Sequence, residues 1–389
     1  MFSSKDSLET LVNIKTLHVY RTYYPDPPGG LQEAMRQIAL SSAGFGVESC
    51  VFTLSPDPYP TEIDRQEARV IRCRSWASPA SCDLGSGAAF RRFAESAEWA
   101  DVIHYHFPWP FADLLHLVVR PKAPTVMTYH SDIVRQRWLG RVYAPLMQGM
   151  LSGMRAIVAT SPPYAQTSPV LADVAHRDRV RVIPLGIDEG SYPQRDDDGV
   201  LQRLGLDQGE PFFLFIGVLR YYKGLHTLVQ AAASVNAKVV IAGTGPEHAA
   251  LQAQVCNFGL QNVVFAGQIS DAEKVALLKR CRAFVLPSHL RSEAYGMVLV
   301  EASMYGKPMV SCEIGTGTSF VNLEGETGFV VPPESPGALA HAMNALLDDG
   351  VLVEKFGRAA RRRYEELFSG PALGKAYTQL YQDVLKNRP

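Results

Sequence analysis

Short apolar runs alternate with amphipathic stretches over nearly the whole chain, and this alternation limits the fold more than any other feature. The runs are rich in Val, Ile, Leu and Phe, as expected of strands buried on both faces of a parallel sheet. Parallel strands need crossover connections, and helical patterns lie between the runs. The alternation therefore predicts a doubly wound α/β protein. The predicted strands are 15–20, 47–54, 68–74, 101–106, 124–129, 155–160, 180–184, 211–217, 238–243, 262–267, 283–287 and 308–312, and the predicted helices include 31–44, 224–235, 246–258, 270–281, 335–348 and 371–387.

So many strands exceed what one sheet comfortably holds, which indicates more than one domain. The 389 residues agree, at roughly 150 residues per domain. The segment 189–211 is polar and punctuated by Gly and Pro, as is typical of a linker. We therefore predict two Rossmann-like domains, 1–190 and 191–370, that face one another across a cleft lined by the carboxyl-end loops of their strands. The last segment, 371–389, is predicted to be a helix that packs back on the first domain.

The composition excludes several classes of protein. The 38 Lys and Arg residues nearly balance 39 Asp and Glu residues, and a formal charge of −1 argues against a nucleic-acid binder. A hydrophobic fraction of 47% argues against disorder. No apolar run is long enough to span a membrane, and the N-terminus has no apolar signal region. The six cysteines are scattered without a CxxC pair, which favours reduced thiols in a cytoplasmic protein over a structural zinc site.

Several glycine-containing loops follow predicted strands. Gly29 and Gly30 stand between a strand and a helix, where they fit either an anion or sugar site or a plain tight turn. The string AGTGPEH (242–248) begins like a dinucleotide fingerprint, but His248 replaces the third glycine, so we reject NAD binding there. Gly306-Lys307 is followed by Pro308, which is not a P-loop.

Two cations follow the strand that ends at Gly217. Arg220 and Lys223 stand at its carboxyl edge, before helix 224–235, and are well placed to neutralise a diphosphate. The alternative is a solvated basic turn, the ordinary environment of exposed Lys and Arg.

The most informative segment is 288–308, which follows strand 283–287. A helix is predicted to begin near 294–296, and its free backbone N–H groups favour phosphate. Glu293 precedes this helix and Glu301 lies about two turns inside it. Carboxylates accept hydrogen bonds from vicinal hydroxyls, such as those of ribose and hexose. The alternatives are helix capping for Glu293 and a solvated face for Glu301, although Glu301 has apolar neighbours.

These motifs together resemble a known family. EAYGMVLVE (293–301) matches the E-x-F-G-x-x-x-x-E pattern of retaining glycosyltransferases of family 4, which have the GT-B fold, with Tyr295 in place of Phe. Further segments also match the family: Gly29-Gly30, TYHSD (128–132), VIPLGID (182–188), GVLRYYKG (217–224), AGTGPE (242–247) and NLEGETGFVVPP (322–333). Each of these matches is weak alone, but their order and spacing along the chain are specific.

The resemblance implies a role for each motif. Glu301 would hold the ribose hydroxyls of a nucleotide diphosphate sugar, and Glu293 would contact the transferred sugar. Arg220 and Lys223 would stabilise the departing diphosphate, and His130 would lie near the sugar. The backbone amides of Tyr295, Gly296 and Met297 would help to hold sugar and diphosphate, and Gly29, Gly30 and Gly217 would lie close to the ligand. Family members commonly carry Arg after the glycine that matches Gly217; here Val218 stands there, and Arg220 is expected to supply the guanidinium.

The resemblance also implies a reaction. A hexose would pass from the donor to an acceptor hydroxyl with retention, by a same-face displacement in which the leaving phosphate accepts the proton. The RYYKG and RSEAYG strings resemble a subgroup of the family that acts on bacterial surface polysaccharides. This resemblance favours GDP-mannose or GDP-rhamnose as the donor and a lipid-linked saccharide as the acceptor, and a UDP sugar stays open as the donor. The only D-x-D string, within Asp196-Asp197-Asp198, lies in the predicted linker, so we expect transfer without a metal or other cofactor.

Two further questions stay open at the level of sequence. Segment 120–155 is basic and contains Trp138, Leu139 and Tyr143, which fits contact with an anionic membrane or, equally, a buried helix with snorkelling arginines. The rival activities are a GT-B nucleotide-sugar epimerase, a glycosidase and an inactive sugar-nucleotide sensor. The oligomeric state is not specified by the sequence.

Overall fold

The structure is a computed structural model that describes residues 13–26, 29–78, 82–132, 137–173, 177–206 and 209–386, with the main chain alone for 137–142. Its contacts divide the chain into two compact units. The first unit comprises Met1–Tyr129, Gln136–Val158 and Leu373–Pro389, and the second comprises His130–Arg135 and Ala159–Ala372.

The division after Val158 lies well before residue 190, where the sequence analysis placed the boundary. Residues that follow it bond to later parts of the second unit. The carbonyl of Leu185 accepts a hydrogen bond from the Tyr295 hydroxyl at 2.9 Å. The N–H of Ile187 donates to the carbonyl of Phe368 at 2.8 Å. These contacts join residues far apart in sequence, so the linker composition at 189–211 does not reveal them.

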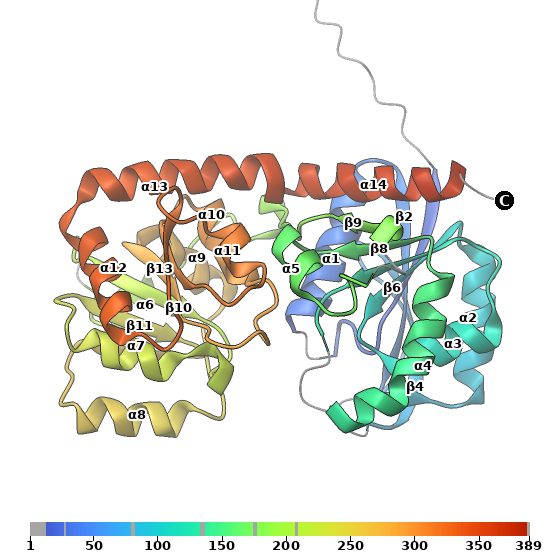
Figure 1. Ribbon diagram of the computed structural model, residues 1–389, viewed down its shortest axis with the longest axis horizontal. Coiled ribbons are helices and arrows are strands. Elements are labelled where there is room, and N and C mark those ends of the chain that lie inside the picture. The colour runs from blue at the N-terminus through green and yellow to red at the C-terminus, as the bar shows by residue number, and fades with distance from the viewer. Residues whose placement is uncertain are drawn as a thin grey trace, which may run out of the picture. The chain divides into compact units, whose positions relative to one another are not determined.

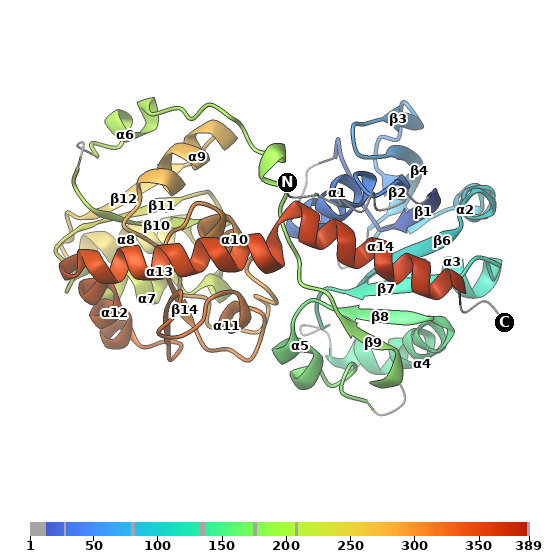
Figure 2. The same ribbon diagram turned by 90° about the horizontal axis from the view of Figure 1, so that it is seen from above.

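The first sheet has nine strands, in the order β3-β4-β2-β1-β6-β7-β8-β9, with β5 paired to β4 (Figure 2). Its central strands β2, β1, β6 and β7 are parallel, and β3 and β5 run antiparallel to β4. The strands are β1 Ile14–Val19, β2 Val47–Ser55, β3 Glu62–Asp64, β4 Arg69–Ala77, β5 Leu84–Gly85, β6 Val102–Phe107, β7 Thr125–Tyr129, β8 Ala156–Ala159 and β9 Val180–Val182; the helices are α1 Gly30–Ala43, α2 Gly87–Trp99, α3 Pro110–Val119, α4 Arg137–Gly153 and α5 Pro162–Thr167, with a short 3-10 turn at Arg177–Arg179.

The second sheet has six strands in the order β12-β11-β10-β13-β14-β15, and all its pairs are parallel. This is the Rossmann order. Strands β10 to β12 are added toward one edge of the sheet and β13 to β15 toward the other, so the strand order reverses between β10 and β13, which we call the reversal point. The strands are β10 Phe212–Ile216, β11 Lys238–Ala242, β12 Val263–Gly267, β13 Ala283–Leu286, β14 Met309–Cys312 and β15 Gly328–Val331; the helices are α6 Gly199–Arg203, α7 Leu225–Ala232, α8 His248–Asn257, α9 Asp271–Arg280, α10 Met297–Met304, α11 Thr318–Val321, α12 Pro336–Asp348, α13 Gly350–Arg363 and the π-helix η5 Tyr364–Phe368, with 3-10 turns η3 Glu189–Ser191 and η4 Tyr221–Lys223 (Figure 1).

The predicted α/β class is therefore confirmed, with two Rossmann-like sheets. The short strands β3 and β5 and the strand β15 were not among those predicted from the sequence. Strands of two or three residues carry no periodicity, and β15 follows the turn-rich string NLEGET. No helix of the described residues is long and apolar enough to cross a membrane.

The predicted final helix is α14, Gly370–Lys386, and from Leu373 onward it belongs to the first unit. Two buried tyrosines hold it against the sheet. The Tyr377 hydroxyl lies 2.9 Å from the Thr128 hydroxyl, and the Tyr381 hydroxyl lies 2.8 Å from Nδ1 of His104. The packing of this helix on the first domain is confirmed.

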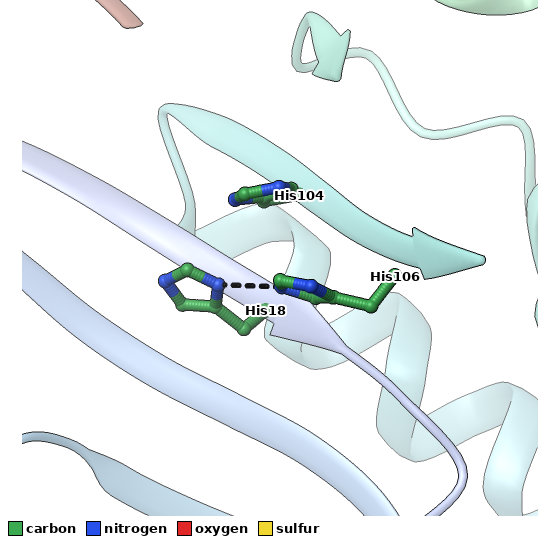
Figure 3. Close-up of side chains that lie close together, drawn as sticks. All are labelled: His18, His104 and His106. Carbon is green, nitrogen blue, oxygen red and sulfur yellow. Dashed lines mark hydrogen bonds between the residues drawn. The ribbon is translucent and has the colours of Figure 1, made fainter. Parts of the chain in front are cut away.

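Three buried histidines lie together beneath this helix, His18 on β1 and His104 and His106 on β6 (Figure 3). Nδ1 of His18 lies 3.1 Å from Nε2 of His106, and Nε2 of His104 lies 2.7 Å from the Thr128 hydroxyl. Burial lowers the pKa of His18 to about 3. The imidazole of His18 is therefore neutral, and hydrogen bonds to one another and to neighbouring hydroxyls hold the three rings in place.

Candidate functional site

The strand order of the second sheet brings two predicted segments together. β10 and β13 are neighbours at its centre, so the loops that leave their carboxyl ends share one edge. The loop after β10 contains Gly217, Arg220 and Lys223, and the loop after β13 contains Glu293. Ligands of open α/β sheets bind at this reversal point.

Lys223 and Glu293 form a buried ion pair between these loops. Nζ of Lys223 bonds to Oε2 of Glu293, and each residue is 8% exposed. The Ser288 hydroxyl donates to the same carboxylate oxygen at 3.3 Å. Burial is the largest influence and lowers the pKa of Lys223, but the charge and hydrogen bond of Glu293 together with Tyr222 outweigh it, and the net pKa is raised. Lys223 is therefore a fixed cation at the reversal point.

Glu301 lies in the second turn of α10 and is also 8% exposed, so it is not part of a solvated face. Its Oε1 accepts hydrogen bonds from the Tyr192 hydroxyl and, at 3.1 Å, from Nζ of Lys274. The Lys274 ammonium also lies 4.7 Å from the centre of the Tyr192 ring. Burial lowers the pKa of Lys274, but the nearby carboxylates of Glu301 and Asp271 together outweigh the effect of burial, and the net pKa is raised.

The two carboxylates share one arrangement. In Glu293 all hydrogen bonds go to Oε2, and in Glu301 all go to Oε1. Within the described residues, the second oxygen of each carboxylate accepts no hydrogen bond. Each side chain is thus fixed through one oxygen, and the other oxygen is able to accept a hydrogen bond from a hydroxyl.

Helix α10 begins with open backbone donors. Its N-cap residue, Gly296, has a φ of 82°, and a Cβ there would lie 3.0 Å from the Leu286 side chain. Glycine allows this left-handed conformation at little cost. In the described part of the chain, the N–H groups of Gly296 and Met297 donate to no protein group, as is usual for the first residues of a helix. These donors suit a phosphate or a sugar oxygen.

Arg220 is exposed, and its guanidinium makes no ion pair with any described residue. Val218, where the family arginine would stand, is 52% exposed. Of the two positions, only Arg220 offers a cation, and that cation is not already neutralised by a described carboxylate.

His130 follows β7 and is 8% exposed. Burial lowers its pKa to about 3, so its imidazole is neutral at physiological pH. Asp132 anchors the same segment to the second unit, because its Oδ2 lies 3.6 Å from the guanidinium of Arg291, two residues before Glu293. The Ser168 hydroxyl donates to the other oxygen of Asp132 at 2.6 Å.

Gly29 and Gly30 lie in the first unit, at the start of α1. The N–H of Gly29 donates to the Gln32 side chain at 2.9 Å, which is part of a capping arrangement. A Cβ on Gly30 would meet no atom of the described residues within 4 Å. The turn is thus explained by capping at Gly29, whereas Gly30 leaves an open approach to the backbone, and a ligand role for either stays a prediction.

Three residues that hold the carboxylates were not singled out in the sequence: Ser288, Tyr192 and Lys274. Tyr192 lies in the segment interpreted as a linker, and Lys274 lies on α9, within the stretch 270–281 that was predicted only to be helical. Their link to Glu301 spans 109 residues for Tyr192 and 27 for Lys274, and no local pattern encodes it.

The second glycine loop has a packing explanation. Gly243 has a φ of 127°, and a Cβ there would lie 2.0 Å from the carbonyl of Gly217. The AGTG string therefore lets the loop after β11 pass closely beside the loop after β10.

The D-x-D string lies apart from these loops and is already paired. Asp196 lies 3.2 Å from the guanidinium of Arg280, and Arg280 also pairs with Asp198. A hollow of about 1120 Å³ nearby is lined by Arg280, Arg282 and Lys307, at the amino ends of strands, and no predicted site residue lines it. The predicted site residues of the second unit thus lie away from this hollow, after the carboxyl ends of β10 and β13.

The basic segment 120–155 is described in part. Arg135 lies outside the described residues, as do the side chains of Trp138 and Leu139. The Tyr143 hydroxyl donates to Asp113 of α3, so this aromatic is bound within the first unit. Burial raises the pKa of Asp113 to about 7 despite this hydrogen bond.

The chain matches two family models. Residues 29–186 match the glycosyl transferase 4-like domain, and residues 197–363 match glycosyl transferases group 1. D-rhamnosyltransferase WbpZ of Pseudomonas aeruginosa is 46% identical over 92% of this chain and 92% of its own. O-antigen chain mannosyltransferase C of Escherichia coli is 41% identical over 96% of this chain and 100% of its own.

Solved structures share the fold. Sucrose-phosphate synthase from Thermosynechococcus elongatus superposes with a TM-score of 0.77 at 22% identity, over 97% of this chain and 100% of that one. Anabaena HepE in complex with UDP gives a TM-score of 0.77 at 19% identity, over 95% and 100%.

Proposed function

The chain belongs to the glycosyl transferases group 1 family and is a hexosyltransferase with the GT-B fold, and we propose that it transfers mannose or rhamnose in the assembly of a bacterial O-antigen polysaccharide. The observation that carries the proposal is the placement of Lys223, Glu293 and Glu301 at one edge of the second sheet. This edge offers a cation for the diphosphate and two carboxylates for hydroxyls.

In the proposed mechanism Lys223 and Arg220 stabilise the negative charge that grows on the leaving diphosphate. The N–H groups of Gly296 and Met297 hold the same ligand, and the open oxygen of Glu301 accepts the ribose hydroxyls. The open oxygen of Glu293 accepts hydroxyls of the sugar. Because Glu293 is held by Lys223, its role is to orient and stabilise the sugar, and the leaving phosphate takes the acceptor's proton. The product keeps the anomeric configuration of the donor.

We propose further that transfer needs no metal ion. Lys223 is a permanent charge already fixed by Glu293, and Arg220 adds a second cation, so protein side chains supply the neutralisation. The Asp196–Asp198 string is engaged with Arg280 and Lys279, which supports a structural role for it.

The proposed donor is a GDP sugar, with the two relatives above as support: one is named a D-rhamnosyltransferase and the other a mannosyltransferase. We expect GDP-mannose or GDP-rhamnose to raise the melting temperature of the purified enzyme, because a ligand that binds only the folded state stabilises it. At about 100 times Kd the gain is roughly 2.7 kcal/mol. A thermal-shift panel of GDP, UDP and ADP sugars measures it; stabilisation by UDP sugars alone would contradict the choice of guanine.

The proposed acceptor is a lipid-linked saccharide, and we propose that the first unit contacts anionic lipid through Arg120, Lys122 and Arg155. These residues line one hollow of about 450 Å³ that has no acidic residue in its lining. Anionic headgroups attract such a group by about 1 kcal/mol per cation.

Flotation with vesicles tests the lipid contact. We expect the enzyme to float with phosphatidylglycerol vesicles and not with phosphatidylcholine vesicles, and Arg120→Ser with Lys122→Ser to reduce the floated fraction severalfold. Substitution of Arg358, an exposed arginine of the second unit, serves as the control. Equal flotation with neutral vesicles would contradict the proposed contact.

A further inference from the structure

Two histidines and a glutamate of the second unit converge outside the machinery described above. His226 is the second residue of α7, His289 follows β13, and Glu334 precedes α12. One nitrogen of each histidine and a carboxylate oxygen of Glu334 all lie within 4.8 Å of one another. The three residues come from three separate segments, each of which follows a strand of the second sheet: His226 lies at the start of α7 after β10, His289 follows β13 and Glu334 follows β15.

The imidazole at the centre of this cluster has no hydrogen-bond partner among the described residues. His289 is 8% exposed, and neither Nδ1 nor Nε2 makes a hydrogen bond with a described residue. A buried imidazole with both nitrogens unsatisfied carries a free-energy cost, and native structures rarely leave one without a partner or ligand.

The side chains of His226 and Glu334 make no hydrogen bond or ion pair with a described residue that would prevent them from binding an ion. Among the described residues, the His226 ring makes ring contacts only, 5.5 Å from the Tyr221 ring and 5.2 Å from the His289 ring, centre to centre. Glu334 is exposed and makes no ion pair with a described residue. Its φ is 54°, a left-handed conformation that is uncommon for a residue other than glycine.

The histidine cluster of the first unit provides a contrast (Figure 3). There both nitrogens of His104 bond to hydroxyls, and His18 bonds to His106. Those imidazoles are held by the protein itself, with only Nε2 of His18 left without a partner among the described residues. The two clusters have similar ligand spacing, but only the one around His289 keeps its nitrogens free for an ion.

We propose that His226, His289 and Glu334 bind a divalent transition metal of the zinc class. Two imidazoles and one carboxylate form a familiar zinc ligand set, with water at the fourth position. The observed spacing is wider than a closed site requires, so the ligands draw together by a small amount when the ion binds. This site is separate from the transfer chemistry, which uses Lys223 and Arg220.

The site would hold the turn that carries those cations. The Tyr221 ring lies 4.9 Å from the His289 ring, edge to face, and stacks on His226. The N–H of His289 donates to the carbonyl of Tyr222 at 3.0 Å. An ion on both histidines therefore fixes turn η4, which follows Arg220 and ends at Lys223, from two sides.

Zinc binding to the purified full-length chain, stripped with EDTA and then dialysed free of it, tests the proposal. We expect one equivalent of Zn²⁺ to bind in calorimetry, and Co²⁺ in its place to give the visible absorption of a four-coordinate site with nitrogen and oxygen ligands. Glu334→Gln and His289→Ala should each weaken binding at least tenfold. His341→Ala, at an exposed histidine of the same unit, should leave binding unchanged.

Hydrogen exchange gives a readout independent of activity. Zn²⁺ should slow the exchange of amides 221–226 in the unaltered chain and not in Glu334→Gln, whose substitution is at the surface and spares the core. Absence of binding, equal binding in all variants, or loss of binding on His18→Gln instead would overturn the proposal.

Discussion

Replacing Lys223 with Met is expected to lower kcat on the order of 10²- to 10³-fold, the usual loss when one preorganised group that stabilises developing charge is removed. Lys223 is the buried cation at the reversal point of the second sheet, and its raised pKa keeps it charged. Its removal leaves Arg220 alone to meet the leaving diphosphate. Single-turnover measurements with saturating donor isolate this step from binding.

The same substitution also affects folding, because it leaves the Glu293 carboxylate buried without its partner. Breaking a buried pair in this way costs about 3–5 kcal/mol, whereas removing both charges is often nearly neutral. The double variant Lys223→Met with Glu293→Gln is therefore expected to recover most of the stability but none of the turnover. Chemical denaturation and kinetics on the same samples separate the two effects. Recovery of turnover in the double variant, or near-normal turnover in Lys223→Met, would show that the pair is structural only.

Replacing Glu301 with Gln is expected to weaken donor binding roughly 10- to 100-fold, since hydrogen bonds to a charged group contribute about 1.5–3 kcal/mol. The expected loss appears in KM for the nucleotide sugar and in Kd for the free nucleotide, with a smaller change in kcat. Isothermal titration with GDP measures it without any acceptor.

Tyr192→Phe is the matched control for this variant. It removes the hydroxyl that bonds to Oε1 of Glu301 but keeps the carboxylate and the Lys274 contact. We expect its affinity for GDP to fall less than about threefold, of the order of one weak hydrogen bond. If Tyr192→Phe and Glu301→Gln weaken binding equally, then Glu301 acts through the local packing and not by contacting the ligand.

The fold was predictable because its signals are local. Apolar runs such as FFLFI at β10 and KVVIA at β11 identify buried parallel strands, and the helical patterns between them require crossovers. The order of those strands, and so the adjacency of β10 and β13, is not a local property. The motifs suggested that Lys223 and Glu293 serve one ligand. Only the sheet order explains why these two side chains, 70 residues apart in sequence, are in contact.

The parts of the site that sequence reasoning missed are long-range in the same sense. Tyr192 is an aromatic residue in a polar, Gly- and Pro-rich stretch, and its composition predicts a linker. Its hydrogen bond to Glu301 forms only because the fold brings helix α10 next to it. Likewise, His289 and His226 are single histidines in unrelated motifs, and they converge with Glu334 only because the segments that follow β10, β13 and β15 come together in the fold.

The most direct test of the account is NMR analysis of the product formed from GDP-mannose or GDP-rhamnose and a lipid-linked saccharide acceptor, with EDTA present. The account predicts acceptor-dependent release of GDP and a new glycosidic bond whose anomeric configuration equals that of the donor. An inverted anomer, a loss of transfer that Mg²⁺ or Mn²⁺ restores, or an isomerised nucleotide sugar formed from donor alone would contradict it.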